Sequence, residues 1–241
     1  MFPIRNARAL LAAFSVLVLA VSSALGQSAP AAKDANLLIQ QGRALVDSGK
    51  RAEGYALFEE AVAVCDAELA ENPARMDSYV VKGWALFRLG RYREAVAVGE
   101  AGLKVKFDAR IVENMGESYF FLRDYAASLR SMQRYIDNSG EYAERVSTAY
   151  FYMGEIYQVQ RKFEHADIAY AIAVQREPNM ARWWFRYGNA VEALGEKERA
   201  RGLYEKALKL APSFPEARDA VARLSAPAAP AAPAAAPAAA P

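Results

Sequence analysis

The chain contains one cysteine and one histidine, and this scarcity excludes several classes of function. With only Cys65, no intramolecular disulfide can form, so the thiol is expected to be either buried and inert or engaged in an intermolecular disulfide. His165 lies 100 residues from Cys65, which is not the spacing of a zinc site. A single histidine without an assignable nucleophile also argues against Ser-His-Asp and Cys-His catalysis. We interpret His165 as part of a solvated helix face.

The sequence also lacks a glycine-rich phosphate-binding loop and a surplus of either charge. It has 30 basic and 28 acidic side chains, but Arg5 and Arg8 lie in a segment that is expected to be removed. Without them the charges balance, and a neutral chain has no electrostatic footprint for nucleic acid. We therefore predict no catalytic residue, no metal, no cofactor and no nucleic-acid partner.

The N-terminus has the features of a secretory signal, residues 1–26. Arg5 and Arg8 precede an uncharged apolar run over residues 9–21, and Ala24 and Gly26 supply small residues before a cleavage point. Export to the periplasm is expected, without stable membrane insertion after cleavage. The alternative is an uncleaved anchor in the inner membrane, although the run is shorter than the ~20 residues of a full span. Residues 27–34 then form a linker.

Glycine recurs through the rest of the chain within a repeated pattern, at Gly42, Gly83, Gly116, Gly154 and Gly188. Each glycine has a large apolar residue four positions before it, another three after it, and a small residue twelve after it. Offsets of −4, 0 and +3 lie on one face of a helix. A second apolar stripe begins after a short break, so each repeat predicts two helices that pack antiparallel.

The glycine in the first helix of each repeat needs a reason, because glycine costs about 1 kcal/mol against alanine there. We expect it to let the two helices approach closely. For Gly188 the expected neighbour is Ala200, twelve residues further on.

The last two repeats carry the fullest pattern, which also includes a closing proline at Pro178 and Pro212. This pattern resembles the tetratricopeptide repeat (TPR) family, over about Ala35 to Phe214. The resemblance implies an all-α, right-handed α-solenoid of five TPR-like helix pairs plus a C-terminal capping helix. The expected units are residues 35–75, 76–108, 109–146, 147–180 and 181–214, followed by the cap at 215–225 and a disordered Ala/Pro-rich tail at 226–241.

Some positions depart from the family pattern. The first unit predicts an over-long second helix that runs to about Leu69 and projects past its neighbour. Tyr135 stands where a small residue is usual and implies a locally wider helix pair. Gly99 and Gly102 make one second helix thin, either as a weak spot or as a seat for a bulky neighbour.

In the family, the first helices line a concave groove, and this groove is the candidate binding site. The predicted groove residues are Arg43, Trp84, Phe87, Arg88, Glu113, Glu117, Phe120, Phe121, Phe151, Glu155, Arg182, Phe185 and Asn189.

Two kinds of aromatic residue are distinguished within this set. Trp84 and Phe121 are expected to contact a partner from one aromatic platform flanked by Arg88 and Glu117. The remaining phenylalanines are expected to pack against neighbouring helices.

The carboxylates of the groove leave an alternative open. Glu113, Glu117 and Glu155 could form a cation site or a glycosidase-type pair, but a polar stripe in a binding groove is favoured. Ile39 and Trp84 occupy positions where a chaperone-tail receptor would need polar donors, which disfavours that function.

Two functions remain from the sequence. The first is a non-enzymatic interaction scaffold of the bacterial cell envelope that binds a peptide segment or a partner protein. The second is an accessory protein that holds an apolar small molecule between Trp84, Phe120, Phe121 and Phe151. An open groove would favour the first, and a closed cavity would favour the second.

Overall fold

The computed structural model describes residues 34–139 and 144–225, and the regular structure within them is entirely α-helical. The predicted signal, nearly all of the linker, and the Ala/Pro-rich tail lie outside the described residues. The helices are α2 (Ala35–Asp47), α3 (Arg51–Glu71), α4 (Met76–Arg88), α5 (Tyr92–Val105), α6 (Ala109–Phe121), α7 (Tyr125–Ser139), α8 (Val146–Val159), α9 (Phe163–Arg176), α10 (Ala181–Ala193), α11 (Lys197–Leu210) and α12 (Pro215–Ser225).

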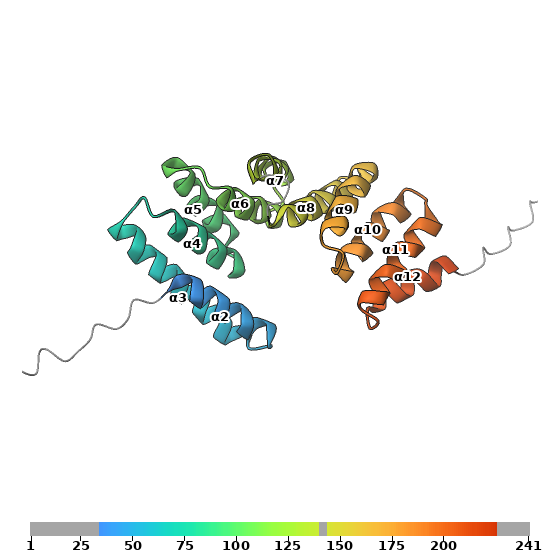
Figure 1. Ribbon diagram of the computed structural model, residues 1–241, viewed down its shortest axis with the longest axis horizontal. Helices are drawn as coiled ribbons and strands as arrows, with labels where there is room; N and C mark the ends of the chain where they lie inside the picture. Colours follow the sequence, from blue (N-terminus) through green and yellow to red (C-terminus); the bar gives the residue numbers. More distant parts are fainter. Residues whose placement is uncertain (1–33, 140–143, 226–241) are drawn as a thin grey trace, which may run out of the picture.

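Consecutive helices form pairs that follow one another along a bent path, from α2 and α3 at one end to α11 and α12 at the other (Figure 1). The last helix, α12, packs against α11 and buries Ala217 and Ala220. The expected all-α solenoid of helix pairs with a C-terminal capping helix is therefore confirmed. Among the described helices, none combines the length and the apolar character needed to cross a membrane.

The turn between the two helices of each pair is short, and one of its residues has the left-handed backbone conformation. Gly49, Gly90 and Gly195 have positive φ there, and Arg123 and Arg161 take the same conformation in the other two pairs. Glycine adopts this region without a steric penalty, which explains why it follows the first helix in three of the pairs.

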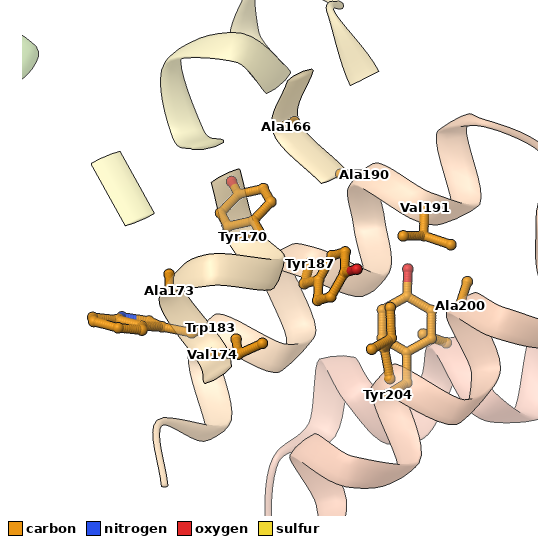
Figure 2. Packing of buried hydrophobic residues seen from close by; sticks show 12 residues of the cluster. Ala166, Tyr170, Ala173, Val174, Trp183, Tyr187, Ala190, Val191, Ala200 and Tyr204 are labelled. Atoms are coloured by element: carbon orange, nitrogen blue, oxygen red, sulfur yellow. The ribbon is translucent and has the colours of Figure 1, made fainter. Parts of the chain in front are cut away.

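In four of the pairs the repeated glycine lies against a side chain of the second helix, but for Gly188 the predicted neighbour, Ala200, was wrong. A Cβ atom at position 188 would lie 2.5 Å from Cε1 of Tyr204, and one at position 154 would lie 2.7 Å from Cδ1 of Tyr170. The glycine therefore accommodates a buried ring sixteen residues later. Ala200 is also fully buried and lies near the Tyr204 ring in the same cluster (Figure 2).

The second unit replaces that ring with Gly99, and the next unit fills the space. A Cβ atom at Gly99 would lie 2.6 Å from Cγ of Met115, and one at Gly102 would lie 2.8 Å from Cδ1 of Ile111. The thin helix α5 is thus a seat for side chains of α6. The close packing of α6 on α5 goes with deep burial of α6, in which every residue from Ile111 to Ser118 is buried.

The long helix α3 ends at Glu71, close to the predicted end, and its last turns contact α4. The Ser78 hydroxyl donates a hydrogen bond of 2.6 Å to Glu68 Oε2, and Lys82 pairs with Asp66. Cys65 lies in the same segment, fully buried, and burial raises the pKa of its thiol to about 12. Such a thiol has little thiolate character, which favours the inert alternative.

Candidate functional site: the groove of the first helices

Aromatic rings form a continuous run across the first helices α4, α6, α8 and α10. Neighbouring ring centroids lie between 4.8 and 5.8 Å apart along this run. Its members, in order of contact, are Trp84, Phe87, Phe121, Phe120, Tyr152, Phe151 and Trp183. Offset and edge-to-face contacts of this kind fix ring orientations. We call this set the aromatic run.

Trp84 and Phe121 belong to one aromatic surface, but each contacts Phe87, which lies between them. Phe87 lies 5.5 Å from Trp84 and 5.6 Å from Phe121 between ring centroids. Phe121 is 46% exposed and stacks on Tyr92 at 4.9 Å. Of the two residues expected to contact a partner, Phe121 is thus the more accessible.

Arg145, which was not among the predicted groove residues, covers Trp84. The Arg145 guanidinium carbon lies 4.8 Å from the Trp84 ring centroid. Its Nε donates a 2.6 Å hydrogen bond to Glu113 Oε1, and its Nη2 donates to Glu117 Oε1. The backbone N–H of Arg145 donates to the hydroxyl of Tyr135 at 3.3 Å. Tyr135, which stands where the repeat pattern usually has a small residue, therefore contacts the start of α8.

Glu113 and Glu117 lie beneath Arg145 and are only 2% and 3% exposed. They therefore present no free carboxylate to a partner, contrary to the polar stripe expected from the sequence. Burial, followed by repulsion from Glu117, raises the pKa of Glu113 well above its ordinary value, while Arg145 opposes the shift. The guanidinium and the two buried carboxylates form an ion-pair cluster between α6 and the start of α8.

Glu155 is also satisfied internally. Arg186 donates to its two oxygens at 2.6 and 2.7 Å, and the Tyr170 hydroxyl donates to Oε1. Each carboxylate considered for a cation site or a glycosidase pair thus has a guanidinium partner. Within residues 34–139 and 144–225, no cluster of three or more His, Cys, Asp or Glu side chains is arranged to hold a metal ion. The geometry does not favour that alternative.

The remaining predicted residues divide between packing and exposure. Asn189 Oδ1 accepts a 2.8 Å hydrogen bond from the Tyr204 hydroxyl, and Phe185 packs on Tyr204 and Phe214. Arg43, Arg88 and Arg182 are exposed, and none forms a hydrogen bond or ion pair with a carboxylate of the described chain.

Two solvent-open hollows border the aromatic run. The first, of about 250 Å³, is the basic hollow, lined by Asn36, Ile39, Arg43, Val80, Val81, Trp84, Arg88, Glu144 and Arg145. The second, of about 490 Å³, is the phenylalanine hollow, lined by Phe120, Phe121, Phe151, Tyr152, Glu155, Arg182, Phe185, Arg186, Phe214 and Glu216.

Several lining residues were not predicted from the sequence, above all Arg145, Tyr152 and Arg186. The two arginines could have been anticipated, because the glutamates at inward positions of the first helices require a positively charged partner when they are buried. Tyr152 lies two positions before Gly154, a position to which the repeat pattern gives no groove role. Phe214 directly precedes α12 and Glu216 lies in its first turn, so both fall outside the first-helix pattern.

Comparison with protein families and solved structures agrees with this geometry. A family profile described as tetratricopeptide repeat matches residues 39–109 and 153–215. A search of curated proteins found no match.

Solved structures of similar shape include MamA and YrrB. One MamA structure is 19% identical, covers 81% of this chain and 98% of its own, and has a TM-score of 0.55. YrrB, described as a TPR protein with an unusual peptide-binding site, is 20% identical, covers 78% of this chain and 91% of its own, and has a TM-score of 0.56. At these identities the likeness shows the shared fold.

Proposed function

Because this chain belongs to the tetratricopeptide repeat family, we propose that it is a non-enzymatic scaffold that binds a peptide segment or a partner protein in the groove of its first helices. The groove has no assembled catalytic group among the described residues of its lining, since Glu113, Glu117 and Glu155 are each held by an internal arginine.

The aromatic run carries this proposal. It places Phe121 at 46% exposure among other rings, beside an open hollow of about 490 Å³. Clustered exposed apolar surface typically marks a site that another molecule covers. Aromatic and arginine side chains are also the residues that most often dominate binding energy at interfaces.

The small-molecule alternative has less support from the geometry. A small ligand is usually buried over most of its surface in one pocket. The four rings proposed to enclose it do not share a pocket, because Trp84 lines the basic hollow whereas Phe120, Phe121 and Phe151 line the phenylalanine hollow. Two open hollows along a continuous surface suit an extended partner better. YrrB, which has the same fold, is described as having a peptide-binding site, and this supports the proposal.

The cellular location belongs to the same proposal. We place the scaffold in the bacterial cell envelope because residues 1–26 have the pattern of a cleaved secretory signal. These residues lie outside the described part of the chain. N-terminal sequencing of the protein recovered from an envelope fraction should show Gln27 as the first residue. An intact Met1 would contradict cleavage and favour a membrane anchor instead.

Affinity capture with matched variants tests the interaction function. The full chain should retain a specific partner from an envelope fraction, and Phe121→Ala should lose it. Ile168→Ala is the control, because Ile168 is 63% exposed on the second helix α9. Equal capture by all three proteins would contradict binding in the groove.

A further inference from the structure

The charges of the groove are arranged asymmetrically. Its carboxylates are paired from within: Glu113 and Glu117 share Arg145, and Glu155 pairs with Arg186. Glu192, at the C-terminal end of α10, is likewise held by Arg223, whose Nη2 lies 2.9 Å from Oε2. Few acidic groups of the groove are therefore free to attract a cationic partner.

The basic hollow, in contrast, has arginines without an ion-pair partner. Arg43 and Arg88 are both exposed there and pair with no carboxylate within the described chain. Partial desolvation within the curve of the solenoid, followed by repulsion from Arg43, lowers the pKa of Arg88, while the charge of Glu117 opposes the shift. Glu144 lines the same hollow but forms no ion pair with either arginine. Three arginines and one carboxylate thus line the hollow, beside the apolar surface of Ile39, Val80 and Trp84.

The phenylalanine hollow has the opposite character. Its charged lining residues balance, because the two arginines Arg182 and Arg186 are matched by the two carboxylates Glu155 and Glu216. An apolar side chain gains from burial against such a surface, by about 25 cal/mol per Å² removed from water. The aromatic run connects the two hollows without interruption.

We propose that the groove selects an extended acidic peptide, in which Asp or Glu side chains bind Arg43 and Arg88 and an aromatic or aliphatic side chain enters the phenylalanine hollow. This inference rests on the proposed function and adds the chemical class of the peptide. Guanidinium groups bind carboxylates through charge-assisted, often bidentate hydrogen bonds, which suits two arginines that lack internal partners. The apolar residue supplies the anchor, and the acidic residues supply orientation and specificity.

Selection from a phage-displayed library of random peptides tests this inference, with the immobilised full chain as bait. Selected sequences are expected to be enriched in Asp or Glu at a fixed spacing from an aromatic or aliphatic residue. A synthetic copy of the strongest peptide should bind the double variant Arg43→Gln/Arg88→Gln about tenfold more weakly, a loss of ~1.4 kcal/mol. Replacing its acidic residues with Gln or Asn should weaken binding to the unmodified chain and leave binding to the double variant unchanged.

The matched control is Arg51→Gln/Arg130→Gln, which removes two exposed arginines from the second helices α3 and α7. It should bind the same peptide normally. Selected peptides without acidic enrichment, or with equal affinity for the double variant and the control, would overturn the acidic specificity and leave the interaction function standing. Failure to select any peptide would contradict peptide binding itself, and the acidic specificity with it.

Discussion

Replacing Gly188 with leucine should destabilise the last repeat strongly, because its missing side chain makes room for Tyr204. A Cβ atom at position 188 would lie 2.5 and 2.7 Å from Cε1 and Cδ1 of that ring. Carbon atoms normally pack 3.5–4.0 Å apart, so an overlap of about 1 Å has to be relieved. Tyr204 is fully buried, so its ring has no adjacent solvent into which it could shift.

Displacing the ring also disturbs its hydrogen bonding. The Tyr204 hydroxyl lies 2.8 Å from Asn189 Oδ1 and 2.7 Å from Glu192 Oε2, and its one proton is donated to either oxygen. Overpacking costs about 1–3 kcal/mol, and the loss of this hydrogen bond costs about 1 kcal/mol. The better helix propensity of leucine returns about 1 kcal/mol. The expected net loss for Gly188→Leu is about 2 kcal/mol.

Gly202→Leu supplies the matched control, because Gly202 lies inside α11 and a Cβ atom there meets nothing within 4 Å. The same substitution should leave stability unchanged or raise it by up to about 1 kcal/mol. Urea unfolding followed by circular dichroism measures both variants, as a change in midpoint at constant slope. Equal midpoints for the two variants would refute the close packing of α10 on Tyr204 and the register of the repeat.

Three further predictions follow from other parts of the chain. Burial raises the pKa of the Glu113 carboxyl in the folded protein, so its contribution to stability is present below the unfolded pKa, near 4.5, and is lost as pH rises through the folded pKa. Glu113→Gln should therefore flatten the fall in the free energy of unfolding as pH rises above about 4.5. The same pH dependence in urea unfolding of the variant and the unmodified chain would contradict a raised pKa at Glu113. Trp84→Ala should weaken partner capture with a smaller loss of melting temperature than Gly188→Leu, and normal capture with a large loss would make Trp84 a core residue. Deleting residues 226–241 should leave the melting temperature unaltered, because a Pro-Ala segment has no large apolar side chain to bury; a lower melting temperature would show that the tail packs on the helices.

The sequence predicted the helix pairs well because their signals are local and repeated. Apolar residues at fixed offsets from each glycine, together with the short breaks between helices, place α10 and α11 without reference to the rest of the chain. Gly99 and Gly102 marked an unusual helix, although only the structure shows that Met115 and Ile111 occupy the space.

The electrostatics of the groove could not be predicted in the same way. Arg145 is 32 and 28 residues from its partners Glu113 and Glu117, and its place depends on how α8 stacks beside α6. The neighbour of Gly188 was misassigned because a small residue and a ring both lie on the facing side of α11, and the periodicity does not distinguish them. Pairings across units depend on tertiary geometry, which the repeat pattern does not contain.

Photo-crosslinking from the groove tests the central claim most directly. Phe121, 46% exposed in the phenylalanine hollow, and Ile168, 63% exposed on α9, can each be replaced in cells with p-benzoylphenylalanine. The proposed function predicts a discrete crosslinked adduct from position 121 and none from position 168. Adducts from position 168 alone, or from neither position, would contradict binding in the groove of the first helices.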